Sequence, residues 1–290
     1  MFCFLILLTT SLCAEDESGI KVKLLVDSRI IRQYDPVLVK IIVINTTDEK
    51  RDIIRPARGI QTLVLSVTRL DGDDDYEALV DADGFTGVAE QRFPIITLPP
   101  HGQFAAYDRV FRKGRFADFV FPHATSHKLR AGILAADKRL IYSEPVNISV
   151  GRRKEKDLEF IKENVELLRS SLIVDDVYIT DPKQIPQLEA IRARLKRDSG
   201  SLPGMLRWRI PAYKFKYGTD QEREAAKTEL AELRKTLSEP ARDMLAISLA
   251  QVAVDAKDYA AAKEELARLK EESAPKRHLE FLIRMGEMKW

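Results

Sequence analysis

Two histidines four positions apart are the first side chains whose spacing suits chemistry. His123 and His127 have the spacing that places two metal ligands on one face of a helix. The surrounding segment, however, has the composition of a turn that leads into a strand, and no HExxH glutamate accompanies the pair. We therefore predict no metal site. A metal-dependent hydrolase, using these histidines with acids of residues 71–83, is the second alternative to our main prediction.

Two acidic stretches offer the oxygen atoms that calcium prefers. They are "DGDDDYE" from Asp71 and "DADG" from Asp81. The alternation of a calcium loop is missing, because Gly72 holds the second place and no Glu stands twelfth from Asp71. A solvated hairpin loop is the interpretation we adopt, and calcium binding by residues 71–83 stays open.

Charge and motifs exclude several classes of function. Lys and Arg number 47 against 45 for Asp and Glu, and no long basic block occurs, so we predict no nucleic-acid partner. The stretch "RWRIPAYKFKY" could stack on single-stranded bases, but its aromatic residues also have helical spacing, which indicates an apolar helix face. The sequence has no GxSxG, no phosphate-binding glycine loop and no GxGxxG. We predict no catalytic residue and no cofactor.

The first 18 residues have the order of a secretory signal peptide. An apolar run from Phe2 to about Leu8 leads to small residues and then to acidic ones. Both cysteines, Cys3 and Cys13, lie in this segment, which excludes a disulfide framework from the exported chain. Leu12 argues against a lipid on Cys13. We predict a periplasmic or secreted protein that meets a membrane only through this segment.

Residues 19–150 follow the two-residue period of β-strands. "IKVKLLV" places apolar side chains on one face, whereas "VLVKIIVIN" is apolar on both faces, as a central strand would be. Turn residues separate these runs, for example Asp35-Pro36 and Pro99-Pro100-His101-Gly102. The pattern predicts an antiparallel β-sandwich.

This β half resembles bacterial immunoglobulin-like domains. The resemblance lies in "YDPVLVKIIVINTTDEKRDI", "TLPPHGQFAAY", "FPHATSHKLRA" and "YSEPVNISV". It implies a sandwich and no particular ligand, and residues 123–127 replace the usual Pro-Gly turn. Asn45-Thr46-Thr47 and Asn147-Ile148-Ser149 match the glycosylation sequon, but we interpret both as structural.

A charged linker, residues 151–156, precedes a helical half at residues 157–290. Apolar residues now recur at three- and four-residue steps. Thr219 with Glu222 forms a capping-box pattern, and the other expected helix starts are at Ser238, Asp258 and Pro275.

Nearly the same phrase occurs twice in this half, 36 positions apart. "AAKTELAELRK" begins at Ala225 and "AAKEELARLKE" begins at Ala261. The second copy resembles a tetratricopeptide repeat at Leu249-Ala250, Asp258-Tyr259, Ala262, Leu266 and Pro275. Lys257, Ala250 and Pro211 depart from that pattern. The resemblance implies stacked helical hairpins, each phrase being the second helix of a pair.

We predict a non-enzymatic extracytoplasmic interaction or scaffold protein: a sandwich followed by a helical stack, a layout that broadly resembles uncharacterised exported bacterial proteins. A protein or peptide partner would bind in the helical groove or at the sandwich edge. The repeat resemblance implies the following groove-facing residues: Trp208, Phe215, Met244, Ile247, Gln251 and Asp255. The first alternative is a sandwich that inhibits proteases or binds glycans through its loops.

Overall fold

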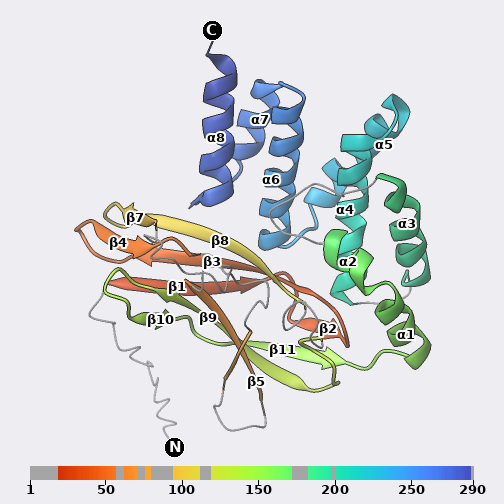
Figure 1. Cartoon of the computed structure of the whole chain (residues 1–290), viewed down its shortest axis with the longest axis horizontal. Coiled ribbons are helices and arrows are strands. Elements are labelled where there is room, and N and C mark those ends of the chain that lie inside the picture. Colours follow the sequence, from red (N-terminus) through yellow and green to blue (C-terminus); the bar gives the residue numbers. More distant parts are fainter. Residues whose placement is uncertain are drawn as a thin grey trace, which may run out of the picture.

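The computed structural model describes residues 19–56, 62–70, 76–79, 94–111, 119–171, 182–196 and 200–288. Strands occupy the first half of the chain and helices the second (Figure 1). The predicted signal peptide, residues 1–18, lies outside the described residues. Most of the acidic 71–83 region does too, since residues 71–75 and 80–93 are not described.

The described strands form three sheets. A four-stranded sheet has the order β1-β3-β8-β12, and a second sheet has the order β2-β11-β9-β5-β6, with β10 paired to β9. Strands β4 and β7 pair with each other. The bounds are β1 Ile20–Val26, β2 Ile30–Arg32, β3 Val37–Asn45, β4 Arg51–Ile54, β5 Leu63–Arg69, β6 Glu77–Ala78, β7 Ile95–Leu98, β8 Gln103–Val110, β9 Ser126–Leu134, β10 Leu140–Tyr142, β11 Val146–Gly151 and β12 Glu272–Ser273.

The first two sheets pack face to face around one apolar core. Strand β1 alternates as its sequence predicts, with Ile20, Val22 and Leu24 buried and the lysines between them exposed. Strand β3 is buried on both faces. Its odd-numbered residues, Val37 to Val43, join the sandwich core, and its even-numbered residues face the helical half. The prediction that "VLVKIIVIN" is a central strand is therefore confirmed.

The sheets are mixed, which corrects the predicted wholly antiparallel sandwich. Strand β2 pairs with β11 in parallel, and β12 pairs with β8 in parallel. The second pair could not be expected from the β half alone, because β12 comes from the helical half. The coarse layout of sheets followed by helices holds.

The helical half contains α1 to α8. Their bounds are α1 Glu155–Glu163, α2 Val165–Ser171, α3 Ile185–Arg194, α4 Ser201–Tyr217, α5 Asp220–Arg234, α6 Glu239–Asp255, α7 Tyr259–Leu266 and α8 Ala274–Glu287, with a 3-10 turn at Pro182–Gln184. The expected helix starts are confirmed. Thr219 and Glu222 form a capping box before α5, and the Asp258 carboxylate accepts from the Ala261 amide before α7. None of the described helices has the length and hydropathy needed to cross a membrane.

The two repeated phrases occupy equivalent places. The first lies on α5, which packs against α4, and the second begins on α7, which packs against α6. The buried positions repeat as well: Ala226, Leu230 and Leu233 in the first phrase match Ala262, Leu266 and Leu269 in the second.

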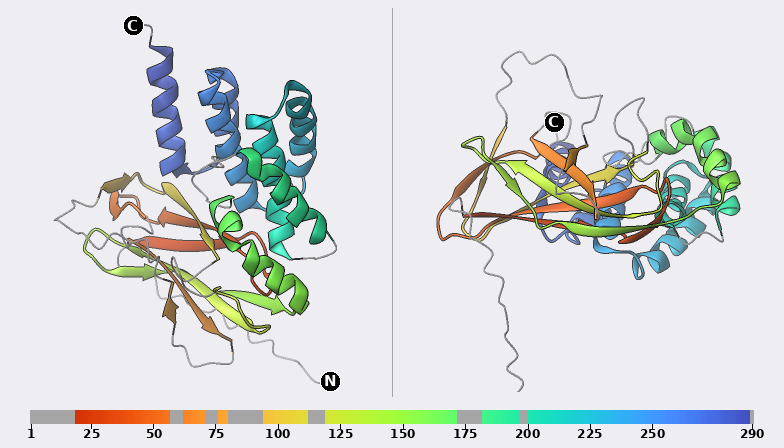
Figure 2. Two further views of the ribbon diagram at one scale, coloured as in Figure 1. Left: turned by 45° about the vertical axis from the view of Figure 1, so that its right-hand side comes forward. Right: turned by 90° about the horizontal axis from the view of Figure 1, so that it is seen from below.

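The helices stand on the outer face of the four-stranded sheet (Figure 1; left view of Figure 2). Leu38, Ala105 and Tyr107 from that face belong to the same apolar cluster as the helix interiors. Helices α4, α6 and α8 each begin near the sheet, as the contacts of Ser201, Asp243 and β12 show. The outer face of the sheet and the helices therefore share one apolar cluster, which is separate from the cluster inside the sandwich.

Candidate functional site

Among the described residues, three carboxylates and a lysine meet where α6 contacts the sheet. Lys40 projects from β3, and its Nζ lies 2.6 Å from Asp243 Oδ2, 2.6 Å from Glu271 Oε2 and 2.8 Å from Glu239 Oε1. The Tyr107 hydroxyl donates to Asp243 Oδ2 at 3.0 Å. We call these five residues the junction cluster.

Elements from both halves position the junction cluster. Glu239 and Asp243 belong to the first turns of α6, whereas Glu271 immediately precedes β12. Carboxylates are favourable near the amino end of a helix because they face its positive dipole end. Lys40, which belongs to the sheet, neutralises part of the negative charge of these carboxylates. The Lys40 side chain is only 1% exposed.

The electrostatics keep Lys40 protonated. Burial alone lowers the pKa of Lys40, but hydrogen bonds to Asp243, Glu239 and Glu271 outweigh it and raise that pKa above its ordinary value. The hydrogen bond from Lys40 also lowers the pKa of Glu239. Burial, with the negative charge of Asp243, raises the pKa of Tyr107.

These directions limit what the junction cluster can do chemically. A lysine serves as a nucleophile or base only when it is deprotonated, which requires a lowered pKa. Among the described residues, Glu239, Asp243 and Glu271 are the one acidic group whose oxygens could share a metal ion. The Lys40 ammonium already lies between those oxygens. The Lys40 ammonium is therefore a fixed cation that links the sheet to α6 and to the residue before β12.

A second polar anchor holds α4. The Asp35 carboxylate, from the β2–β3 turn, accepts from the Ser201 amide at 2.7 Å and the Leu202 amide at 3.3 Å. Arg153 Nη2 pairs with the same carboxylate at 2.7 Å, and both side chains are at most 2% exposed. Asp35 thus supplies to α4 the cap that its own Gly200 lacks. Arg153 lies in the predicted charged linker, where it is buried rather than solvated.

A third anchor lies at the start of α8. Glu272 and Ser273 form β12 and pair with Phe104 and Ala105 at the edge of β8. The Ser273 hydroxyl then accepts from the Lys276 amide and caps α8. One short segment therefore both completes a sheet edge and begins a helix.

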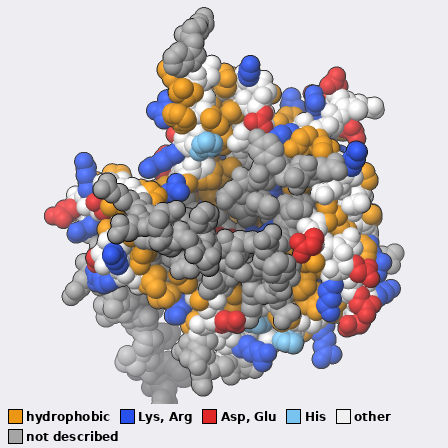
Figure 3. Space-filling model, viewed as in Figure 1, with side chains coloured by type: hydrophobic (Ala, Val, Ile, Leu, Met, Phe, Trp, Pro, Cys, Tyr) orange, Lys and Arg blue, Asp and Glu red, His pale blue; other side chains and the backbone are white. Residues whose placement is uncertain are grey.

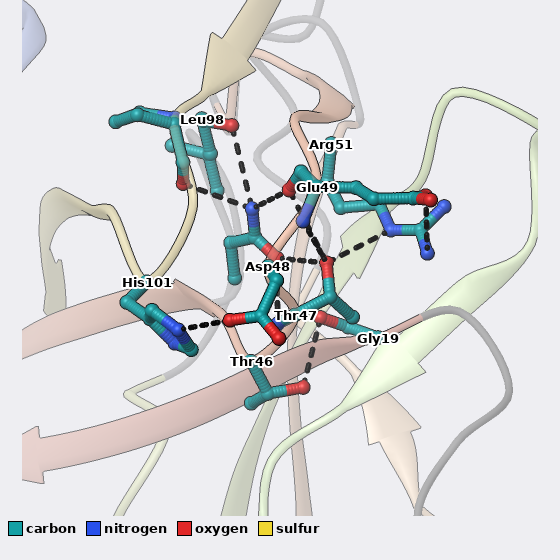
Figure 4. A network of polar contacts seen from close by, with 10 residues as sticks. Gly19, Thr46, Thr47, Asp48, Glu49, Arg51, Leu98 and His101 are labelled. Atoms are coloured by element: carbon teal, nitrogen blue, oxygen red, sulfur yellow. Dashed lines mark hydrogen bonds and ion pairs between the residues drawn. The ribbon is translucent and has the colours of Figure 1, made fainter.

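The first sequon forms a closed polar turn (Figure 4). Asn45 is fully buried, and its amide donates to the carbonyls of Glu49 at 2.6 Å and Pro99 at 2.9 Å. Its oxygen accepts from the Thr47 amide at 3.0 Å and hydroxyl at 2.8 Å. These contacts occupy the Asn45 amide, which agrees with a structural interpretation. Asn147, in the second sequon, is exposed on β11.

The two histidines at spacing four occupy different environments. His123 is exposed in a turn, whereas His127 is buried on β9 with its ring 5.3 Å from that of Phe121. They do not lie on one helix face, because His127 belongs to a strand. Neither joins a three-ligand group within the described part of the chain.

The six predicted partner-binding residues divide into two sets. Trp208, Met244 and Ile247 are 1–5% exposed and lie in the core. Phe215 is half-buried against the same core, and Gln251 and Asp255 lie near the end of α6 away from the sheet. There Asp255 accepts from Gln251 at 2.9 Å and from Lys216 of α4 at 2.8 Å. The structure therefore brings Gln251 and Asp255 together with Lys216, a residue absent from the prediction.

The sequence reasoning missed the junction cluster. One signal was present, since Lys40 is the single charged residue of the apolar run "VLVKIIVIN". A charge on a strand buried on both faces requires a partner. Nothing local identified Asp243 or Glu271 as that partner, because about 200 residues or more separate them from Lys40.

The sheets and anchored helices define a two-part protein. No protein-family model and no curated protein matches the chain. The crystal structure of Spo0M, a sporulation control protein from Bacillus subtilis, aligns at 12% identity over 52% of this chain and 56% of that chain, with a TM-score of 0.30. A β-glucosidase, EmGH1 from Erythrobacter marinus, aligns at 11% identity over 45% of this chain and 15% of that chain, with a TM-score of 0.27. At such TM-scores these likenesses carry no inference about fold or function.

Proposed function

We propose that this chain is a non-enzymatic scaffold that binds a protein or peptide partner on its helical half. The proposal rests on the buried ion pairs that lie between the sheets and the helices. Lys40 with its three carboxylates, and Arg153 with Asp35, join the halves and hold the starts of α6 and α4. Polar groups arranged in this way build a rigid support for an exposed surface.

The outer ends of α4 and α6 supply the surface for a partner. Phe215, Lys216, Gln251 and Asp255 lie there, and we call them the outer rim. An ion pair between Lys216 and Asp255 links the two helices across the rim. A mixed set of one aromatic and several charged or amide side chains suits a peptide contact that combines apolar burial with hydrogen bonds.

The balanced charge also supports a protein partner. On the face shown in Figure 3, basic and acidic side chains are interspersed over both halves. Hydrophobic side chains gather along α8. Phe281 on this helix is 53% exposed, and Met288, which directly follows the helix, is 49% exposed. Exposed large apolar residues of this kind suit contact with another protein.

The finer fold assignments form part of the proposal. An immunoglobulin-like sandwich is supported by two packed sheets with a common core. A tetratricopeptide-like stack is supported by the α4–α5 and α6–α7 pairs, whose buried positions repeat at 36 residues. Export to the periplasm or the medium is proposed from the sequence of residues 1–18.

A glycan-binding sandwich is a second candidate, and one observation favours it. Tyr142 is 41% exposed as a whole residue, and the Arg130 guanidinium lies over one face of its ring, 4.2 Å from the ring centre. Exposed aromatic rings on sheet faces can stack on sugars. Titration with soluble glucans and a Tyr142→Ala variant tests this candidate, because a glycan site there would lose affinity at least tenfold.

Affinity capture with the full chain tests the scaffold proposal. Trp208 is a core residue, so its substitution would report on folding rather than on a partner surface. We would instead compare the native chain with Asp255→Arg, which reverses charge at the outer rim, and with Lys227→Glu, which reverses charge on the exposed side of α5.

The proposal expects one protein from an extract of the source cells to bind the native chain and Lys227→Glu. The same protein should be lost with Asp255→Arg, and the purified pair should reproduce the result. Equal retention by all three chains, or capture of nothing by any of them, would contradict partner binding at the outer rim.

A further inference from the structure

We propose that a pocket between α3 and α4 binds a small oxyanion that carries phosphate or carboxylate groups. The pocket has a volume of about 660 Å³ and is lined by residues of α3, by Lys196 and Gly200, and by the first turns of α4. Volumes of this order are typical of small-molecule sites. Its chemically informative lining residues are Glu189, Arg192, Lys196, Gly204 and Arg207.

The lining carries more positive than negative charge. Arg192, Lys196 and Arg207 supply three cations, and Glu189 is the single carboxylate of the described lining. Lys214, which does not line the pocket, holds Glu189 Oε1 at 2.6 Å and offsets its charge. The field inside the pocket therefore favours an anion.

One of these cations has a protein partner that an anion can replace. Arg192 Nη2 lies 3.2 Å from Glu229 Oε1, and both side chains are more than a third exposed. An ion pair of this kind contributes little free energy in water. The guanidinium can therefore turn toward a bound oxyanion at small cost, and guanidinium groups match carboxylate and phosphate oxygens in pairs.

Open space lies beside Gly204, an exposed residue of the pocket lining. A Cβ added to Gly204 would meet nothing within 4 Å. Glycine inside a helix is less stable than alanine by about 0.5–1 kcal/mol, and no described neighbour requires a glycine there. The open space beside Gly204 leaves room for an anion among the lining side chains.

The side chains, and not the helix terminus, must bind the anion. Asp35 already accepts from the amides of Ser201 and Leu202, and Pro203 has no amide hydrogen. The amino end of α4 is thus capped from the sandwich side. Affinity should depend on Arg207 and Lys196 in particular.

Calorimetric titration of the full chain with sodium phosphate, and separately with sodium citrate, tests the proposal at constant ionic strength. Arg207→Glu reverses one charge of the pocket, and Lys227→Glu reverses one exposed charge on α5 as the matched control. Gly204→Trp fills the pocket without altering any charge. Circular dichroism establishes that each variant is folded.

We expect one saturable site for at least one of the two anions, with about tenfold or greater loss of affinity in Arg207→Glu. Lys227→Glu should bind as the native chain does, and Gly204→Trp should not bind. Binding of phosphate alone, or of citrate alone, would support the site and identify its ligand chemistry. Absence of saturable binding for both anions, or equal weakening by Arg207→Glu and Lys227→Glu, would overturn it. If Gly204→Trp does not fold, the comparison of Arg207→Glu with Lys227→Glu still tests the proposal.

Discussion

Lys40 shows how one residue can join two halves of a chain. The aliphatic part of its side chain leaves β3, whose other residues are uncharged. Its ammonium contacts carboxylates on α6 and before β12. The desolvation of a buried charge is offset only when its hydrogen bonds are complete. Three carboxylate partners at 2.6–2.8 Å meet that requirement.

Lys40→Met should therefore destabilise the protein by about 3–5 kcal/mol at pH 7, because it leaves buried carboxylates without a counter-ion. The loss should be smaller near pH 4, because without the Lys40 hydrogen bond the pKa of Glu239 is no longer lowered and its carboxylate takes up a proton more readily. Urea unfolding at both pH values measures it. Lys21→Met, at an exposed position of β1, is the control and should change stability little. Equal stability of Lys40→Met and the native chain at pH 7 would show that the junction cluster contributes nothing.

Asp27 should make stability depend on pH. Burial raises its pKa to about 7, although amide hydrogen bonds from Leu38 and Ser28 act in the opposite direction. The folded state then binds a proton that the unfolded state releases above its ordinary pKa of about 4. Stability contributed by protonated Asp27 is present below about pH 4 and is lost as pH rises toward 7.

Asp27→Asn removes this titration and keeps an oxygen that can accept from Leu38. We expect the variant to be more stable than the native chain by about 1–3 kcal/mol at pH 8, with a smaller difference at pH 5. Urea midpoints at the two pH values measure the difference. Asp52→Asn, an exposed change on β4, should show no such dependence. A constant difference between Asp27→Asn and the native chain across this range would refute the assignment.

At the scale of elements, the start of α4 has two glycines with opposite requirements, Gly200 at the N-cap and Gly204 inside the helix. A Cβ on Gly200 would lie 2.2 Å from Asp35 Oδ2, whereas a Cβ on Gly204 would enter open space. Gly200 therefore has to be small so that Asp35 can cap the helix. Gly204 has no such reason in its described surroundings.

Gly200→Ala should lower the unfolding free energy by about 1–3 kcal/mol, because it displaces the buried Asp35 carboxylate. Gly204→Ala should raise it by about 0.5–1 kcal/mol, because alanine favours the helix. Thermal melts of the two variants beside the native chain test both signs. If both variants were destabilised by a similar amount, the contact with Asp35 would not be the reason that position 200 requires glycine.

Local sequence signals predicted most elements correctly. Alternation identified β1, continuous apolar character identified β3, and side-chain caps identified the starts of α5 and α7. The repeated phrases identified equivalent helices. These predictions were correct because each signal depends on residues that lie close together in the sequence.

The junction could not be predicted in the same way. Lys40 meets Asp243 across 203 positions and Glu271 across 231. Trp208, Met244 and Ile247 were expected in a groove, but apolar side chains at helical spacing suit a core equally well. Packing against another layer decides which face of a helix is buried. In this protein the four-stranded sheet provided that layer.

At the scale of the whole molecule, the apolar cluster shared by the outer sheet face and the helices predicts a single unfolding transition. The outer face of the four-stranded sheet contributes Leu38, Ala105 and Tyr107 to the cluster that fills the helical half. Far-UV circular dichroism at a wavelength dominated by helix and tyrosine near-UV dichroism should give coincident urea midpoints. Two separated transitions would show that the halves unfold independently.

Strand β12 has a consequence for the synthesis of the chain. The edge of β8 at Phe104 and Ala105 is covered by Glu272 and Ser273, which the ribosome makes almost 170 residues later. Until then, a nascent sandwich presents that edge with unpaired amide and carbonyl groups, the kind of edge on which chains aggregate. Strand β12 therefore covers this edge only after α7 has been made, and slow translation of the helical half would lengthen the time during which the β8 edge stays unpaired.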